Sequence, residues 1–174
     1  MDTSEPAWVE HVIWWHVYPL GFLGADTTGL DRAAEPRLRR LVPWLDHLIE
    51  LGANGLALGP VFTSVSHGYD TTDYLEVDPR LGTSEDLTHL IDEAHRRGIR
   101  VMLDGVFNHV GREFPQLIDA QTDPASIAAS LFERDGSGGL ATFEGHGGLV
   151  ALDHSTDAVA DLVVEVMDHW LEMG

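Results

Sequence analysis

Three polar side chains follow a short apolar run near the middle of the chain. The run covers residues 99–103, IRVML, and Asp104, Asn108 and His109 come after it. A short, continuous apolar run bounded by glycine is typical of a strand that is covered on both faces of a parallel sheet. Ligands of parallel α/β proteins bind at the carboxyl ends of the strands. We therefore expect an acid, an amide and an imidazole at one rim of a sheet, and this rim is the candidate site.

A second group of polar and aromatic residues follows an earlier apolar run. The run covers residues 55–58, and the loop expected over residues 63–82 contains His67, Tyr69, Asp70, Asp73 and Tyr74. Loops that follow parallel strands open on the same face, so we expect these side chains to face His109. Aromatic rings beside neutral hydrogen-bonding groups suit sugars, which have apolar C–H faces and directional hydroxyls. The two groups together indicate a carbohydrate site.

Strands and helices that would position these residues alternate along the chain. Apolar patterns predict strands over residues 12–18, 55–58 and 99–103, and helices over 38–49, 83–97 and 159–170. Pro43 conflicts with a helix interior, so the regular helix begins close to it or kinks there. Thr83 and Asp86 have the spacing of a capping box. Alternating strands and helices predict an α/β fold with a parallel sheet.

The spacing of the strands limits the architecture. A complete (β/α)8 TIM barrel typically needs about 250 residues, and this chain has 174. An open α/β sheet is the alternative, but three helices are few for covering both faces of a sheet. We therefore expect the N-terminal portion of a (β/α)8 TIM barrel, with a small inserted domain after the third strand.

Composition excludes several classes of partner. The formal net charge of −19 would repel nucleic acid and anionic membrane surfaces. Cysteine is absent, which excludes disulfides and thiolate metal sites and is compatible with a reducing compartment. The N-terminal residues are acidic where a secretory signal is basic, and no apolar stretch is long enough for a membrane helix. We expect a cytoplasmic protein with no nucleic-acid or membrane partner.

Several ordered motifs resemble those of one enzyme family. They are VYPLGF at residues 17–22, HGYDTTDY at 67–74, DPRLGT at 78–83, DGVFNH at 104–109 and LVALDHS at 149–155. The set resembles the α-amylase family of retaining glycoside hydrolases and extends over most of the chain. The resemblance implies activity on α-linked glucans such as maltooligosaccharides, starch or cyclodextrins, by hydrolysis or transglycosylation.

The resemblance also implies roles for individual residues. His67, Tyr69 and His109 would bind the sugar whose glycosidic bond is cut, with Tyr69 stacking and the histidines bonding hydroxyls. Asp104 would be a structural partner at the site. Ser66 stands where family members that remove a terminal glucose usually carry an aspartate, which argues against an exo-acting glucosidase.

The family pattern divides the chain into three parts. Residues 1–110 would form the first three βα units, 111–155 the inserted domain, and 156–174 the third barrel helix. The nucleophile and the acid/base carboxyl group would follow later strands, after Gly174. We therefore expect no catalytic residue in this chain, an inactive isolated chain, and the remainder of the barrel as its partner, in cis or in trans.

Metal binding and two other functions stay open on sequence grounds. Asn108, a second structural residue of the site, and Asp153 match positions that bind calcium in some family members, so a structural Ca²⁺ is possible and no other cofactor is expected. A metal-dependent barrel hydrolase would use Asp104, His109 and His67 as ligands. A non-catalytic sugar-binding or scaffold half-barrel is the third alternative.

Overall fold

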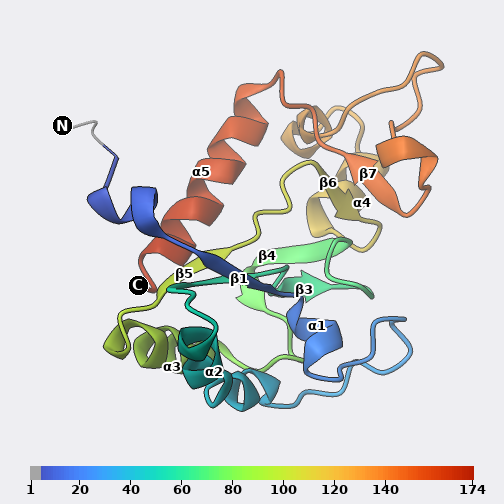
Figure 1. The fold of residues 1–174 in the computed structure, drawn as a ribbon. Helices are drawn as coiled ribbons and strands as arrows, with labels where there is room; N and C mark the ends of the chain where they lie inside the picture. Colours follow the sequence, from blue (N-terminus) through green and yellow to red (C-terminus); the bar gives the residue numbers. More distant parts are fainter. Residues whose placement is uncertain (1–4) are drawn as a thin grey trace.

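The centre of the molecule is a parallel sheet. The computed structural model describes residues 5–174, and its sheet has the order β1-β2-β5, with bounds Trp14–Val17, Gly55–Leu58 and Arg100–Leu103. The three strands are in register, so Val17, Leu58 and Leu103 end side by side at one rim. The parallel sheet predicted from the alternating pattern is confirmed (Figure 1).

Two helices cover one face of this sheet. They are α2 (Trp44–Glu50) and α3 (Ser84–Arg96), which lie together below the strands in Figure 1. The leucines that these helices direct toward the sheet are completely buried, and so is Leu56 of β2. The helix residues are Leu45, Leu48, Leu87 and Leu90. Burying a leucine side chain contributes about 1.5–3 kcal/mol. This layer of leucines is the main core that fixes the strand ends.

The helix starts follow local sequence rules. The predicted helix over 38–49 is divided at Pro43, where a 3₁₀ turn (Arg37–Leu41) gives way to α2. Pro43 lacks an N–H group, so the regular helix begins after it. The predicted capping box at the start of α3 is confirmed: the backbone N–H of Asp86 donates to the hydroxyl of Thr83, and the Asp86 carboxylate accepts from the Thr83 N–H.

The third strand differs from its prediction. The run 99–103 reads as buried, but in β5 Arg100 is exposed and Met102 is 46% exposed. The reason is that β5 is an edge strand in the described part of the chain. Helix α5 (Asp157–Leu171), predicted over 159–170, lies over only one side of it, and the two form an apolar groove.

Two elements replace expected loops. The loop expected over 63–82 is largely an antiparallel hairpin of β3 (Phe62–Ser64) and β4 (Thr71–Val77). A short helix, α1 (Pro19–Phe22), follows β1 in place of a turn. The hairpin register shifts on both sides of Thr63. Such bulges break the two-residue alternation by which strands are recognised in a sequence.

Residues 109–151, between β5 and α5, form a small layer of their own. Strands β6 (His109–Gly111) and β7 (Leu149–Ala151) pair antiparallel above the sheet (Figure 1). Between them lie α4 and two 3₁₀ turns, with bounds Pro115–Thr122, Ile127–Leu131 and Phe143–Gly145, and another 3₁₀ turn, Ala7–His11, precedes β1. Among the described residues, no helix is both long and apolar enough to cross a membrane.

Candidate active site

The carboxyl ends of β2 and β5 bring Tyr69 and Asp104 together. Tyr69 lies in the loop between β3 and β4, and its hydroxyl donates a hydrogen bond of 3.2 Å to Oδ2 of Asp104, which follows β5. Burial and the negative charge of Asp104 both raise the pKa of Tyr69, so the phenol keeps its proton and stays a donor at neutral pH. The Tyr69 side chain is 38% exposed, so part of its ring is available to a ligand.

The loop that carries Tyr69 is held by its own side chains. The carboxylate of Asp70 accepts from the backbone N–H of Ser66 at 3.1 Å and from its hydroxyl at 2.6 Å. Gly68 has a φ of 92°, which a residue with a side chain rarely adopts. Asp70 is therefore a structural residue of the loop and does not face His109 as a free carboxylate.

His67 lies beside Tyr69 on the same loop. Its Nδ1 accepts from the Tyr69 backbone N–H at 3.2 Å, and the two rings are 6.2 Å apart. The Tyr18 hydroxyl donates to the His67 carbonyl at 2.8 Å, which ties the loop to the end of β1. The His67 side chain is 46% exposed. With Nδ1 occupied, its Nε2 is the atom free to bond a ligand.

His109 is the most constrained group of the site. It begins β6 and is 6% exposed. The side-chain amide of Asn108 donates to its Nδ1 at 3.0 Å, because an amide nitrogen only donates. Its Nε2 therefore carries the proton, and among residues 5–174 no acceptor makes a hydrogen bond of regular geometry with this buried group. Buried polar groups are nearly always satisfied, so this donor stands out among the groups of the site.

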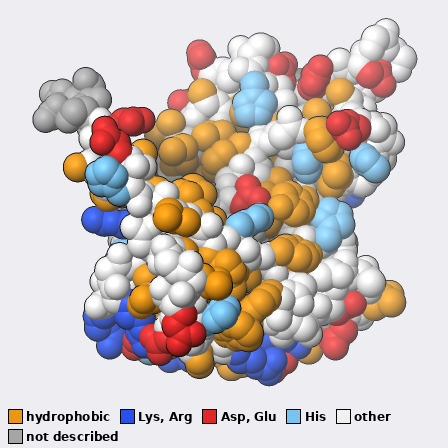
Figure 2. Space-filling view, viewed as in Figure 1, with side chains coloured by type: hydrophobic (Ala, Val, Ile, Leu, Met, Phe, Trp, Pro, Cys, Tyr) orange, Lys and Arg blue, Asp and Glu red, His pale blue; other side chains and the backbone are white. Residues whose placement is uncertain are grey.

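The charge state of His109 follows from its surroundings. Burial lowers the pKa of His109 and the charge of nearby His67 lowers it further, while a weak polar contact with the Tyr69 backbone and the charge of Asp70 raise it. The imidazole is therefore neutral at pH 7. Strand β6 runs so close to the loop that a Cβ on Gly111 would lie 2.5 Å from the Asp70 carbonyl oxygen. This close approach sets His109 beside the loop of His67 and Tyr69, as the sequence predicts. In Figure 2, histidine side chains lie among hydrophobic ones on the face that is shown.

A buried ion pair supports the loop from below. Arg80 and Asp78 are each 1% exposed, and Nε of Arg80 donates to Oδ1 of Asp78 at 2.8 Å. The same guanidinium donates to the carbonyls of Ser66 and Asp26. Sequence reasoning used DPRLGT only as a motif and assigned this pair no role. The signal was an aspartate and an arginine two positions apart in an otherwise apolar turn.

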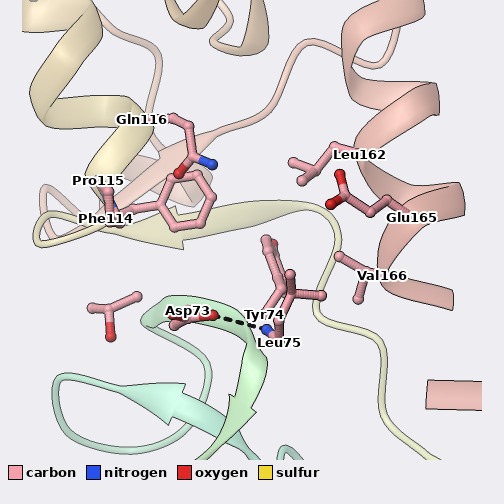
Figure 3. A pocket seen from close by; sticks show the side chains of 10 residues that line it. Asp73, Tyr74, Leu75, Phe114, Pro115, Gln116, Leu162, Glu165 and Val166 are labelled. Atoms are coloured by element: carbon pink, nitrogen blue, oxygen red, sulfur yellow. Dashed lines mark hydrogen bonds between the residues drawn. The ribbon is translucent and has the colours of Figure 1, made fainter. Parts of the chain in front are cut away.

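Two residues expected at the rim lie elsewhere. Tyr74 is buried, and its hydroxyl donates to the Val106 carbonyl at 2.6 Å. Asp73 accepts from the Leu75 N–H at 2.8 Å. Figure 3 shows both at a cavity of about 200 Å³ between β4, α4 and α5, which His67, Tyr69 and His109 do not line. Tyr74 therefore supports the Asp104–His109 segment from beneath, because alternate strand positions point to opposite sides.

The possible metal ligands do not cluster. Among residues 5–174, no three histidine, aspartate or glutamate side chains lie close enough together to hold a metal ion. The Asn108 amide is bonded to His109, and the Asp153 carboxylate accepts the Ser155 hydroxyl at 2.6 Å. The metal-hydrolase alternative gains no ligand set from this geometry, and calcium binding at Asn108 and Asp153 stays a prediction.

Comparisons with known proteins agree with this arrangement. The chain is 39% identical over 131 residues to a cyclomaltodextrinase of a Bacillus species, a match that covers 67% of this chain and 24% of that protein. It is 37% identical over 134 residues to the intracellular maltogenic amylase of Bacillus subtilis, covering 68% and 23% respectively. The chain thus spans about a quarter of the length of these relatives.

A solved structure and a family model extend the match. The cyclic α-maltosyl-(1→6)-maltose hydrolase of Arthrobacter globiformis, in complex with maltose, superimposes with a TM-score of 0.81 at 27% identity, covering 97% of this chain and 44% of that one. The model of the α-amylase catalytic domain matches residues 16–137, which include the end of β1, all of β2 and β5, the loop with Tyr69, and His109. The chain therefore belongs to the α-amylase family.

Proposed function

We propose that the protein carrying this chain hydrolyses or transfers α-linked glucans, such as maltooligosaccharides, starch or cyclic dextrins, with retention at the anomeric carbon. The observation that carries the proposal is the unpaired Nε2–H of buried His109 beside the exposed ring of Tyr69. A sugar offers a hydroxyl oxygen to the first and a C–H face to the second. The names of the relatives, which include a cyclomaltodextrinase and a maltogenic amylase, support glucans as the substrate class.

Each site residue then has a distinct task. Tyr69 stacks on the sugar ring, and its bond to Asp104 fixes the plane of the phenol. His67 and His109 bond sugar hydroxyls through Nε2, and Asn108 fixes the tautomer of His109. Contacts to hydroxyls that strengthen as the ring flattens lower the barrier to bond cleavage. Ser66 has its hydroxyl bonded to Asp70, so no carboxylate stands at this position to cap a terminal glucose.

The bond-breaking groups belong to another part of the protein in this proposal. Retaining glycosidases need two carboxyl groups about 5 Å apart, and the nucleophile and the acid/base would follow strands after Gly174. The sheet β1-β2-β5 would be the first three strands of a (β/α)8 barrel, residues 111–155 an inserted domain, and 156–174 the third helix. The share of the relatives that this chain covers supports a larger catalytic unit. A cytoplasmic location stays a prediction.

The test compares the whole protein with two site variants. We expect the whole protein to release products from maltotriose and a cyclic dextrin with retained anomeric configuration by NMR, and residues 1–174 alone to give no turnover. Tyr69→Ala and His109→Ala should each lower kcat/KM about tenfold or more, since about 1.4 kcal/mol of lost transition-state stabilisation is a factor of ten. His95→Ala, on the exposed surface of α3, is the matched control.

Each alternative predicts another result. A non-catalytic scaffold would bind maltotriose, detected by calorimetry, without turnover by the whole protein. Turnover that is lost on chelation and restored by zinc or iron would favour the metal-dependent hydrolase. If both variants keep the parent kcat/KM on every glucan tested, the assigned sugar contacts are wrong.

A further inference from the structure

Phe143 was not predicted as a site residue from the sequence, but it contacts the site directly. Its ring stacks on the imidazole of His109, with centroids 4.8 Å apart and planes 23° from parallel. It lies in the small layer beyond β5, in the 3₁₀ turn Phe143–Gly145. No motif of the sequence assigned it a role.

The backbone holds Phe143 in this place. Val150 of β7 pairs with Val110 of β6 on one side, and Thr142 forms a bridge to Val150 on the other. Phe143 is therefore one residue beyond the bridge, at the start of the 3₁₀ turn beside β7, the strand whose Ala151 pairs with His109. The stacking contact is set by sheet pairing rather than by a mobile loop.

The turn after Phe143 has an unusual conformation. Glu144 has φ 49° and ψ 28°, the left-handed region that residues with a side chain seldom occupy. The turn is closed by the His146 N–H, which donates to the Phe143 carbonyl at 2.8 Å. Uncommon backbone conformations cluster at functional sites, where the surrounding structure enforces them. Here the turn directs one aromatic ring onto His109.

The exposure of Phe143 argues against a role as core filling. Its side chain is 36% exposed, whereas the core residues of the same layer, Phe114, Phe132 and Val150, are at most 2% exposed. Phe143 contacts the site through the ring face that stacks on His109. On the His109 ring, Nδ1 accepts a hydrogen bond from the Asn108 amide, and Nε2 has no regular hydrogen bond within residues 5–174.

We infer that Phe143 is a positioning residue, which holds the plane of the His109 imidazole so that its Nε2–H points at the sugar. The inference rests on the proposed function. Asn108 alone fixes one atom of the ring and leaves rotation about the side-chain bonds open, whereas a stacked aromatic ring fixes the plane. Aromatic pairs prefer such offset stacks. Phe143 thereby acts on the sugar through His109 and need not touch it.

The first experiment observes the His109 ring without any sugar. ¹⁵N NMR of the whole protein with labelled histidines reports which ring nitrogen of His109 carries the proton and the pKa of the ring. We expect wild type to show the Nε2–H form of His109, and Phe143→Ala to show a mixture of both forms with a pKa moved up toward the ordinary value, because burial is its largest cause. Other ionisable groups facing the ring are His67 and Asp70, with Glu144 next to Phe143. Their titrations are followed in the same spectra.

The second experiment measures coupling in the whole protein. We expect Phe143→Ala to lower kcat/KM about 2- to 12-fold, the range of one aromatic pair, and to add nothing to His109→Ala, because both act through one ring. Phe143→Tyr should restore the parent value. Ile127→Ala, 87% exposed in the same layer, is the control and should change neither readout.

The outcomes separate the two proposals. An unchanged His109 tautomer and pKa in Phe143→Ala, or losses that add to those of His109→Ala, would overturn the positioning role. A normal kcat/KM in His109→Ala itself would remove the sugar contact that the proposed function assigns to His109, while the sugar-free NMR result would still decide whether Phe143 orients the ring. A collapse of the folded spectrum in Phe143→Ala but not in Ile127→Ala would make Phe143 a stability residue and overturn the inference.

Discussion

Replacing Arg80 with methionine should destabilise the protein more than any surface substitution. Arg80 and Asp78 are each 1% exposed and bonded to one another. Methionine has a similar length but no charge, so Arg80→Met leaves the Asp78 carboxylate buried without its partner. Breaking a buried ion pair from one side typically costs about 3–5 kcal/mol. At about 2–4 °C per kcal/mol for a chain of this size, Tm should fall by roughly 6–20 °C.

A matched surface variant gives the scale for this effect. Arg96 pairs with Glu93 on α3, and its side chain is 63% exposed. Exposed ion pairs contribute about 0–1 kcal/mol, so Arg96→Met should lower Tm by no more than a few degrees. Thermal unfolding followed by near-UV circular dichroism measures both variants in the same buffer. If Arg80→Met melts no lower than Arg96→Met, the reasoning about the buried pair is refuted.

The double variant separates charge from hydrogen bonding. Changing Asp78 to leucine together with Arg80→Met removes both buried charges, which is often close to neutral. Arg80 also donates to the carbonyls of Ser66 and Asp26, and these lose a donor in the double variant. We therefore expect recovery of part of the lost Tm but not all of it. The Ser66 contact also links stability to function, since Ser66 adjoins the loop of His67 and Tyr69.

Two further predictions concern local structure. Hydrogen bonds from the N–H groups of Asp31, Thr28 and Leu30 and from the Thr28 hydroxyl lower the pKa of Asp26 to about 2. Because this pKa is lower in the folded protein than in the unfolded chain, the Asp26 carboxylate favours folding above pH 4 and loses that effect as the pH falls toward 2. Asp26→Asn should therefore flatten the acid-unfolding curve between pH 4 and pH 2, and an unchanged curve would contradict the prediction. Thr83→Ala removes the cap of α3 and should cost about 0.5–2 kcal/mol in urea unfolding, with Thr83→Ser as the control that keeps the bond.

Local rules in the sequence determined much of the scaffold. Residues 55–58 form a strand because the apolar run Leu56–Leu58 between Gly55 and Gly59 favours a fully buried position, and residues 55–58 are all buried. The start of α3 follows from the Thr83 and Asp86 spacing, and the division of the earlier helix follows from Pro43. Such signals act between neighbours in the chain, so they do not depend on what packs around them.

The sequence also predicted the centre of the candidate site. Tyr69 meets Asp104, and His109 lies beside the same loop, because the carboxyl ends of parallel strands share one rim. Order along the chain and one topological rule were sufficient for this step. Which atom of each side chain is free depended on contacts that the rule does not give.

Only the tertiary structure decided those contacts. The register shifts of the hairpin interrupt the alternation of apolar and polar residues, so the sequence predicts a loop where β3 and β4 lie. For the same reason it places Tyr74 at the ligand-facing rim. The exposure of Met102 depends on the edge position of β5, and the Arg80 network and the Phe143 stack join segments far apart in the sequence. Packing, register shifts and the pairing of buried polar groups arise from several segments at once, so no window of neighbouring residues contains them.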